Sequence, residues 1–335
     1  MNYQELINNI WRHHDLENAA HDYTNLVRYA TMAASSHNTQ PWKFRLEPDR
    51  ITILPDLTRR CPAVDPDDHH LYASLGCAAA NLQEAASAAG LSSQIQYDDT
   101  IPGLVVDFET ASPSRSALFD AIPKRQCSRV PYDGTEINVT ELQQLENIGR
   151  GDGVSLILLT GKEKLKEVAR YVTNGNIAQI NDSEWVNELK TWIRFNESHA
   201  VATGDGLYGR SMGNPNAPKW LGSLILRFAL TPKNQNHKDM KNILSSSGVA
   251  IIYSESDDKT HWIESGRCYE RFALQAVAMG LRTAFINPPV EVRELRSQFA
   301  SWLGIGNRRP DLVIRFGRGP MMPPSLRRPV EDVII

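Results

Sequence analysis

Four side chains that can form hydrogen bonds are concentrated in one short stretch of the sequence. They are Ser35, Ser36, Asn38 and Gln40. The stretch follows an apolar helical segment that ends at Ala34, and it precedes Pro41, which favours extended backbone for the residue before it. A polar loop held between a helix and a strand suits a small polar ligand, although roughly half of such loops only terminate a helix.

Two arginine-containing stretches could bind an anion. The first is Arg125-Gln126-Cys127-Ser128-Arg129-Val130-Pro131-Tyr132, and the second is Arg315-Phe316-Gly317-Arg318-Gly319-Pro320. A guanidinium group is planar and can pair with two oxygens of an anion at once. Taken alone, each is more simply explained as surface charge.

Two histidine pairs could suggest a metal ion. His69-His70 follows Asp67-Asp68, and His13-His14 lies near the N-terminus. Adjacent residues of a helix point in different directions, so we expect His69-His70 to form a solvated first turn, and we interpret His13-His14 in the same way. No metal site is predicted. The sequence also shows no recognisable Ser/His/Asp triad and no Gly-x-Gly-x-x-Gly motif after a strand.

Charge and hydrophobicity exclude some classes of partner. The chain of 335 residues has a formal net charge of −3, which argues against binding to nucleic acid. No apolar run approaches the roughly 20 residues that cross a bilayer, and the N-terminus lacks a secretion signal. The cysteines fall at no spacing typical of a metal or redox site: Cys61, Cys77, Cys127 and Cys268. We therefore expect a cytoplasmic protein with reduced thiols and no membrane partner.

The hydrophobic periodicity predicts interleaved helices and strands. Helices are expected at 4–12, 16–34, 65–90, 114–122, 139–148, 162–180, 183–197, 220–229, 236–245, 260–279 and 290–300. Strands are expected at 42–46, 51–54, 94–97, 104–109, 154–159, 249–253, 282–286 and 311–316. Residues 202–219 are rich in Gly and Pro and predict a long loop that is disordered or acts as a lid. The proline-rich stretch 320–330 predicts an extended arm.

One helical segment is repeated later in the chain. Gly76-Cys77-Ala78 through Ala89-Gly90-Leu91 resembles Gly266-Arg267-Cys268 through Met279-Gly280-Leu281, at an offset of 190 residues. Both copies start at a glycine, carry an apolar stripe and end at Gly-Leu. The sequence therefore predicts two copies of one α+β unit.

Taken together, these stretches resemble the nitroreductase family of FMN enzymes. The pattern small-Ser-Ser-x-Asn-x-Gln-Pro-Trp at 34–42 resembles the signature loop of the family, and Arg125 to Tyr132 resembles its Arg-Arg-Ser/Thr-x-Arg-x-aromatic motif, with Cys127 in place of the hydroxyl residue. In ordinary nitroreductases the arginine motif precedes the loop, whereas here it follows the loop. This order and the C-terminal tail resemble the Acg-like subgroup, in which one chain is a fused dimer that keeps one of two sites.

The resemblance implies an internally duplicated α+β fold of nitroreductase type and one FMN per chain. The halves would be 1–112 and 113–319, with a C-terminal arm at 320–335. It implies FMN contacts from Ser35, Ser36, Asn38, Gln40, Pro41 and Trp42 in the loop, from Arg125, Cys127, Arg129, Arg315 and Arg318 at the phosphate, and from Ile286 and Asn287 beside flavin N5. In particular, a backbone N–H near Ile286 would stabilise reduced flavin.

The implied activity is two-electron transfer from NAD(P)H to a small-molecule acceptor such as a nitroaromatic or a quinone. The alternative is a protein that binds and stores FMN without turnover. The fused halves would form a pseudo-dimer within one chain, and further self-association stays open.

Overall fold

The computed structural model describes residues 1–17, 19, 22–98 and 100–335. Its first elements are α1 (Tyr3–Ile10), α2 (Thr24–Thr31), β1 (Trp42–Glu47), β2 (Arg50–Pro55), α3 (His69–Ala88), β3 (Leu91–Asp98) and β4 (Gly103–Thr110). The middle of the chain forms α4 (Ala117–Ala121), α5 (Val139–Ile148), β5 (Val154–Thr160), α6 (Lys162–Asn181), α7 (Ser183–Trp192), β6 (Ile193–Arg194), α8 (Glu197–Thr203) and β7 (Leu207–Tyr208). The remaining elements are α9 (Lys219–Ala229), α10 (Pro232–Leu244), β8 (Gly248–Ser254), α11 (Lys259–Ala278), β9 (Arg282–Phe285), α12 (Pro288–Glu291), α13 (Arg293–Leu303) and β10 (Arg309–Gly317).

The two main sheets have the same topology. The first has the strand order β1-β2-β4-β3 and the second the order β5-β8-β10-β9, and every neighbouring pair in both is antiparallel. In each half the long helix, α3 or α11, connects the second strand to the third. The halves differ in what separates their first two strands, because β1 and β2 form a hairpin whereas α6 to α10 lie between β5 and β8. This repeated order of strands and helix confirms the predicted α+β fold and its internal duplication.

The central helices cross so closely that each needs a glycine. A Cβ atom on Gly76 of α3 would overlap the carbonyl oxygen of Ile263, and a Cβ atom on Gly266 of α11 would overlap the carbonyl oxygen of Ala73. These two contacts are equivalent, because both glycines and both carbonyls are related by the same shift of 190 residues. A reciprocal exchange of this kind is typical of the interface between identical subunits, and here it lies within one chain.

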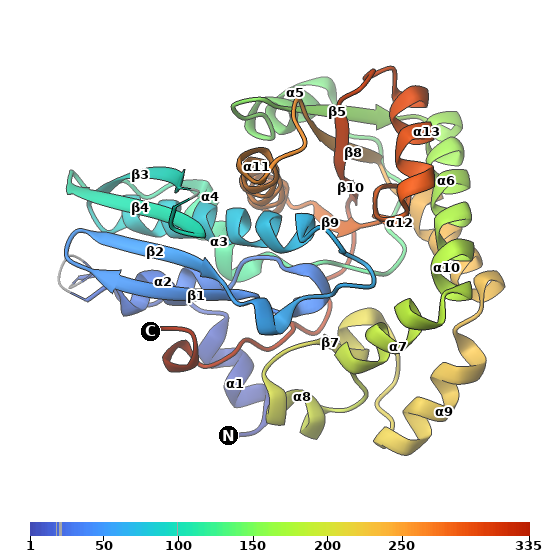
Figure 1. Cartoon of the computed structure of the whole chain (residues 1–335), viewed down its shortest axis with the longest axis horizontal. Coiled ribbons are helices and arrows are strands. Elements are labelled where there is room, and N and C mark those ends of the chain that lie inside the picture. The colour runs from blue at the N-terminus through green and yellow to red at the C-terminus, as the bar shows by residue number, and fades with distance from the viewer. Residues whose placement is uncertain (18, 20–21, 99) are drawn as a thin grey trace.

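The core encloses α3 and α11 between the two sheets (Figure 1). The second sheet is buried on both faces. Along β8, Ala250 and Ile252 face the central helices, whereas Val249 and Ile251 face an outer layer that includes residues of α6 and α13. Strand side chains alternate between faces, so burial on both sides gives β8 a continuous apolar sequence.

Several expected boundaries were wrong. The helix expected at 16–34 is only α2 from Thr24, and residues 18, 20 and 21 lie outside the described part of the chain. The helix expected from Asp65 begins at His69. The residue directly before the helix is Asp68, but the carboxylate of Asp65 caps the first turn, because it accepts hydrogen bonds from the N–H groups of His70 and Leu71, at 3.0 and 2.9 Å.

The C-terminal arm returns to the first sheet (Figure 1). The Phe44 N–H donates to the Val333 carbonyl at 2.7 Å, and the Ile335 N–H donates to the Phe44 carbonyl at 2.9 Å. The arm therefore connects the last strand of the second half to the first strand of the first half. Within the described residues, every helix is too short or too polar to cross a membrane.

Candidate functional site

The signature loop, residues 35–40, has an unusual backbone. It contains one turn of 3₁₀ helix, Ser36–Asn38. His37, Asn38 and Gln40 have φ angles of 47°, 55° and 54°, in the left-handed region that residues other than Gly rarely adopt. Each such residue costs about 1–3 kcal/mol, so the surroundings must hold the loop in this conformation.

Asn38 and Gln40 are the residues that hold the loop in place. Both side chains are buried, and their partners come from the segment after α8 and from the C-terminal arm. Asn38 donates to the carbonyls of Gly206 (3.1 Å) and Leu326 (3.2 Å) and accepts from Arg327 Nη1 (2.9 Å). Gln40 donates to the Gly204 carbonyl (2.9 Å) and accepts from the Arg328 N–H (2.8 Å). Both amides are therefore already engaged within the protein, contrary to the expectation that they face a ligand.

The two serines of the loop differ in whether their hydroxyl groups already have a hydrogen-bond partner within the protein. Ser35 Oγ accepts the Gln40 N–H at 3.1 Å, which closes the loop. Ser36 is half-buried, and among the described residues its hydroxyl has no hydrogen-bond partner. Pro41 and Trp42 are buried, with Trp42 in the central core. Ser36 is therefore the hydroxyl of this loop that is free for a ligand, and a flavin contact by Pro41 or Trp42 stays a prediction.

Arg125 is a buried structural residue. Its Nε atom lies 2.8 Å from Glu270 Oε1, and its Nη2 donates to the Met32 carbonyl at 2.8 Å. Glu270 also accepts the Ala34 N–H, at 3.3 Å, so the ion pair links α11 to the start of the signature loop. Burial raises the pKa of Glu270, and Arg125 opposes that shift. The expectation that Arg125 faces solvent is wrong, and its role at a phosphate has no support in this geometry.

The two arginines near the end of β10 also have protein partners. Arg315 is buried, and its guanidinium donates to the carbonyls of Ser128 (2.7 Å), Val130 (2.9 Å) and Asn242 (3.3 Å). It also lies over the ring of Tyr132, 4.0 Å from the centroid, and so it braces the arginine motif from behind. Arg318 pairs with Glu141 at 2.9 Å on the surface.

Arg129 and His37 each carry a group without a partner in the described part of the chain, and the buried Nε1 atom of Trp42 is a further one. The guanidinium of Arg129 is half-buried, and no hydrogen-bond acceptor contacts it within the described residues. Burial lowers the pKa of His37 to about 4, and the charges of Arg129 and His70 lower it further. The Nδ1 atom of His37 is buried without a hydrogen-bond partner in the described structure. Sequence reasoning missed His37 because it occupies the variable position of the loop pattern.

Further positive charge surrounds Arg129. Burial lowers the pKa of Lys238 and Asp239 opposes this, whereas Arg129 and Arg315 lower it further. Three cationic side chains therefore influence one another here with one nearby carboxylate. This excess of positive charge fits an anionic group such as a phosphate.

The rest of the arginine motif pairs with the strand β9. The Ser128 N–H donates to the Thr283 carbonyl at 3.0 Å, and Ser128 Oγ donates to the Pro320 carbonyl at 2.9 Å. Cys127 Sγ lies 3.9 Å from the Tyr269 hydroxyl. The hydroxyl of Ser128 is thus already used as a donor, so it is not free to replace the hydroxyl that Cys127 lacks.

The expected N–H donor after β9 is not available at Ile286. Its N–H donates to the Val313 carbonyl at 2.9 Å. The neighbouring Asn287 accepts the Val313 N–H on Oδ1 at 2.9 Å, and its Nδ2 lies 3.4 Å from His70 Nε2. These hydrogen bonds join the segment after β9 to β10, so the Ile286 N–H is not free for a flavin. A flavin contact by Asn287 stays a prediction.

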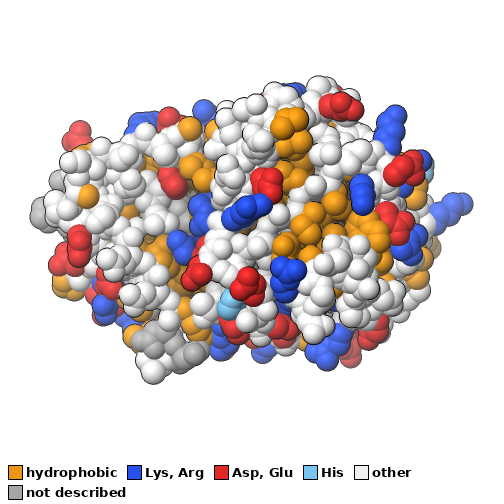
Figure 2. All heavy atoms as spheres, turned by 90° about the horizontal axis from the view of Figure 1, so that it is seen from above, with side chains coloured by type: hydrophobic (Ala, Val, Ile, Leu, Met, Phe, Trp, Pro, Cys, Tyr) orange, Lys and Arg blue, Asp and Glu red, His pale blue; other side chains and the backbone are white. Residues whose placement is uncertain are grey.

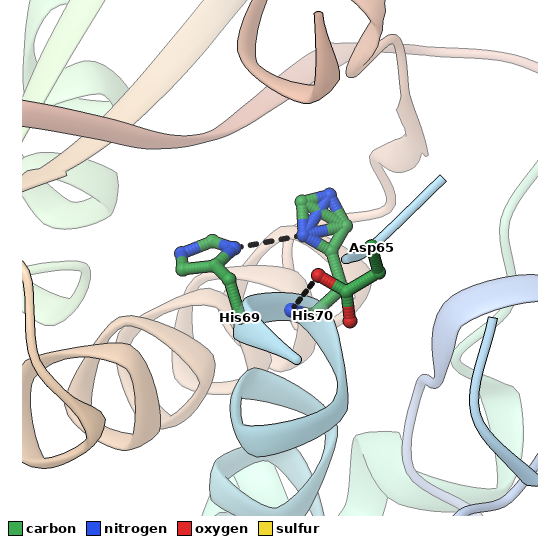
Figure 3. Close-up of side chains that lie close together, drawn as sticks. All are labelled: Asp65, His69 and His70. Atoms are coloured by element: carbon green, nitrogen blue, oxygen red, sulfur yellow. Dashed lines mark hydrogen bonds between the residues drawn. The ribbon is translucent and has the colours of Figure 1, made fainter. Parts of the chain in front are cut away.

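The expectation of a solvated His69-His70 turn is wrong. Both imidazoles are buried, with His69 1% and His70 7% exposed, and their Nδ1 atoms lie 2.8 Å apart (Figure 3). Asp68, which precedes the helix, has a φ of 62°, so the helix begins abruptly and its first two side chains turn towards each other. His13 and His14 lie elsewhere, around the hydroxyl of Tyr29.

The first part of the expected lid is firmly packed. Gly204 to Gly209 are buried, and Asp205 forms ion pairs with Arg194, at 2.6 Å, and with Arg59. This segment also holds Asn38 and Gln40, so it is an ordered part of the structure, and a role of residues 202–219 as a lid stays a prediction. Residues 213–216 are exposed and continue into α9, whose apolar side chains Trp220 and Phe228 are both about 70% exposed.

Two cavities lie away from these residues. One, of about 480 Å³, lies between α1 and the C-terminal arm, and the other, of about 780 Å³, is lined by α13 and the start of β10. Neither is lined by the signature loop or the arginine motif. On the face that includes α5 and β5, positive and negative side chains are interspersed with small apolar patches (Figure 2).

Comparison with known proteins gives relatives along most of the chain. No family model matches the sequence. The protein named "Putative NAD(P)H nitroreductase Rv3131" of Mycobacterium tuberculosis is 24% identical over 325 residues, which cover 92% of this chain and 90% of that protein. "Putative NAD(P)H nitroreductase acg" of the same organism is 23% identical over 319 residues, covering 92% and 93%.

Solved structures of nitroreductases are similar over a smaller part of the chain. A nitroreductase with bound FMN from Desulfitobacterium hafniense has a TM-score of 0.41 at 10% identity, covering 66% of this chain and 98% of its own. The FMN-dependent nitroreductase NfnB from Mycobacterium smegmatis, in complex with NADPH, has a TM-score of 0.39 at 12% identity, covering 61% and 87%. The relatives that extend along 92% of the chain, acg among them, confirm the resemblance of this protein to the Acg-like subgroup of the nitroreductase family.

Proposed function

We propose that the protein is an FMN-dependent oxidoreductase of nitroreductase type. It would take hydride from NADH or NADPH and pass two electrons to a nitroaromatic, a quinone or a similar small acceptor. The two relatives are named as NAD(P)H nitroreductases and match over nearly their whole length, which supports this reaction class. Bound FMN would supply the redox chemistry, and the protein would place and tune it.

The observation that carries the proposal is the pair of unpartnered groups where the signature loop meets the arginine motif. Arg129 provides a half-buried guanidinium that no carboxylate contacts within the described residues, and His37 provides a half-buried imidazole whose buried Nδ1 atom has no hydrogen-bond partner there. A buried polar atom without a partner is costly, so such an atom indicates a missing ligand. Arg129 would bind the FMN phosphate, and Ser36 and His37 would bind polar atoms of the ribityl chain or ring.

The same arrangement supports one FMN per chain. The signature loop occurs once, before β1, and the segment before β5 has Gly149-Arg150-Gly151-Asp152-Gly153 at the equivalent position. The arginine motif likewise occurs once. We propose accordingly that the halves 1–112 and 113–319 together form a single site, closed by the arm 320–335.

The packing of residues 204–209 favours a second candidate function, the storage of FMN. A lid must open to admit an acceptor, whereas this segment is buried and fixed by ion pairs of Asp205. A permanent cover of this kind would shield a bound flavin from substrates. The second function differs from the first only in whether bound FMN is reduced by a nicotinamide.

Anaerobic addition of NADH or NADPH to the purified yellow protein distinguishes the two functions. An oxidoreductase should lose its visible flavin absorption within seconds, and an added quinone should restore it. A spectrum that neither nicotinamide changes would contradict the oxidoreductase and leave the storage function. Protein that neither carries FMN after purification nor binds added FMN would contradict both.

A further inference from the structure

A second constellation of chemically active side chains lies at the start of α3. Asp65, His69 and His70 each present one ligand atom, and these atoms all lie within 4.8 Å of one another (Figure 3). All three side chains are at least nine-tenths buried. The flavin proposal uses none of them.

Main-chain N–H groups hold the carboxylate, and side chains orient the two imidazoles. The Asp65 carboxylate is held above the first turn of α3, because it accepts the N–H groups of His70 and Leu71. The two imidazoles point their Nδ1 atoms at each other, 2.8 Å apart. Two ring nitrogens and one carboxylate are thus already assembled in one place, and the two rings have to turn slightly apart to admit an ion, because their Nδ1 atoms face each other at hydrogen-bond distance.

A carboxylate lies behind each imidazole. His69 Nε2 is 2.9 Å from Asp311 Oδ1 in β10, and His70 Nε2 is 3.5 Å from Glu291 Oε1 in α12. A histidine that donates its Nε2 proton to a carboxylate keeps the lone pair of Nδ1 unprotonated and aimed at the opposite side of the ring. This is the outer-shell arrangement that orients metal-binding histidines and makes them more basic.

The acidic side chains around the cluster suit a bound cation. Asp65, Glu291 and Asp311 lie in a buried region, and two arginines act on them: Arg309 Nε lies 3.8 Å from Asp311 Oδ1, and the charge of Arg296 also acts on Glu291 and Asp311. Asp311 Oδ2 has no hydrogen-bond partner in the described structure. Buried carboxylates without enough opposite charge are costly, and a divalent cation would supply the missing charge.

The ring nitrogen that carries the proton in His69 and in His70 can be assigned both with and without a bound cation. Without one, two bare lone pairs 2.8 Å apart would repel, so one ring must carry its proton on Nδ1. Asn287 Nδ2 lies 3.4 Å from His70 Nε2, which favours His70 as the ring that donates from Nδ1 to His69. When a cation binds, this proton moves from Nδ1 to Nε2 of His70, where the Glu291 carboxylate accepts it. The net charge of the ring does not change.

We propose that Asp65, His69 and His70 bind one divalent transition-metal ion of the zinc class. The ligands would be the two Nδ1 atoms and one carboxylate oxygen, with a water molecule in the fourth position. Two imidazoles with one carboxylate and an open position suit Zn²⁺ and the neighbouring divalent metals, whereas Mg²⁺ and Ca²⁺ prefer all-oxygen sites.

The site would be coupled to the signature loop. Ser74 Oγ donates to the His70 carbonyl at 2.6 Å and accepts the Ser36 N–H at 3.3 Å. The first turn of α3 is therefore one residue away from the loop that carries Ser36 and His37. A metal ion that stiffens this turn would also stiffen the loop.

The test uses the full-length protein with its native flavin content. Titration with Co²⁺ after removal of metal by a chelator should give d–d absorption bands at longer wavelengths than flavin, and they should saturate at one Co²⁺ per chain. Zn²⁺ should abolish the bands by competition. X-ray absorption of the Zn²⁺ form should show two imidazole ligands. Absence of bands, or a spectrum without imidazole, would overturn the proposal even without any variant.

Variants locate the site. His69→Gln and His70→Gln should each remove the Co²⁺ bands, whereas His237→Gln, at an exposed position of α10, should leave them unchanged. Glu291→Gln keeps all three ligands and should weaken metal affinity about 10- to 100-fold, because only the outer carboxylate changes. Circular dichroism confirms that each variant is folded. Binding that persists unchanged in both histidine variants would contradict the assignment.

Discussion

The arginines of the predicted site have different roles. They differ in how deeply the side chain is buried and in whether it has a hydrogen-bond or ion-pair partner. Arg125 and Arg315 are almost completely buried and bonded to carbonyls or to Glu270, whereas Arg129 is half-buried with no such partner among the described residues. The sequence places Arg125 and Arg129 in one motif but carries no information on their partners, since Glu270 lies 145 positions beyond Arg125. A motif therefore predicts where cations gather, and the fold decides which of them can reach a ligand.

Arg129→Ala should weaken FMN binding about 10- to 100-fold. The change removes one or two charge-assisted hydrogen bonds, each worth roughly 1.5–3 kcal/mol. The melting temperature of the flavin-free protein should stay the same, because Arg129 bonds to no described residue. Equilibrium titration with FMN and with riboflavin, which lacks the phosphate, measures the effect, and only FMN binding should fall. Arg318→Ala, which removes an exposed pair with Glu141, is the control. Unchanged FMN affinity of Arg129→Ala would contradict the phosphate role.

Arg125→Ala should mainly destabilise the fold. It would leave Glu270 buried without its partner, and breaking such a pair costs about 3–5 kcal/mol. Urea unfolding of the flavin-free protein measures the loss, and the double change Arg125→Ala with Glu270→Gln should recover part of it because the buried charge is gone. If Arg125→Ala keeps full stability but loses FMN, the phosphate role first inferred from the motif is right.

His37 should make stability depend on pH in the acid range. Burial, followed by the charges of Arg129 and His70, lowers its pKa from 6.5 to about 4 in the folded chain. Between these values the unfolded chain binds a proton that the folded chain does not, so stability is full above the unfolded pKa and falls as the pH drops towards 4. The stability advantage of wild type over His37→Asn should therefore shrink as the pH falls from 7 to 4.5 in urea unfolding experiments. A difference that is constant over this range would show that His37 titrates normally.

At the scale of elements, the sequence predicts features that depend on neighbouring residues and misses those that depend on residues far away in the chain. The apolar stripes of α3 and α11 and the cap at Asp65 are local features, so the sequence predicts these elements well. The conformation of the signature loop depends on Arg327 and Arg328, almost 290 positions away, and no local pattern contains that information. The same limit applies to His69 and His70, whose burial depends on β10 and α12.

The arm serves as a cap for α2. Arg327 donates to three carbonyls at and just beyond the end of the helix, those of Thr31 (2.7 Å), Met32 (3.0 Å) and Ala33 (3.1 Å). A helix leaves its last carbonyls unpaired, and a cation at this end also interacts favourably with the helix dipole.

Arg327→Ala should therefore destabilise the helix end and the signature loop together. We expect a loss of about 2–4 kcal/mol, because several bonds from one buried charged donor are removed. Hydrogen exchange should rise at residues 32–40 and stay unchanged in the second sheet. Arg12→Ala, which removes an exposed side chain of the same type, provides the comparison. Uniform acceleration of exchange across both sheets would show that the arm supports the whole fold and not this loop.

At the scale of the molecule, the duplicated architecture is what the sequence predicts best. The repeat at an offset of 190 residues lies in α3 and α11, which form the contact between the halves. The inserted helices α6 to α10 have no counterpart in the first half, so the repeat could not predict where they pack. Of these, α6 and α10 pack on the outer face of the second sheet, and the segment after α8 holds the signature loop.

Gly76→Ala and Gly266→Ala should destabilise the protein by similar amounts. Each added methyl group would overlap a backbone carbonyl of the opposite helix, and overpacking of this kind costs about 1–3 kcal/mol. Thermal unfolding of the two variants measures the cost, and Gly209→Ala, where the nearest atom would lie 3.6 Å away, is the control. A large effect at one position and none at the other would contradict the equivalence of the two contacts.

The reciprocal contact of α3 and α11 also changes how such a protein can diverge over generations. In a homodimer, one mutation of the gene alters both sides of the interface and both binding sites at once. Any loss of stability or of binding affinity therefore occurs twice in each dimer. In this chain Gly76 and Gly266 are encoded separately, and a substitution alters one side only. The two halves could therefore diverge independently, so that only the first carries the signature loop and only the second has the helices α6 to α10 between its first two strands.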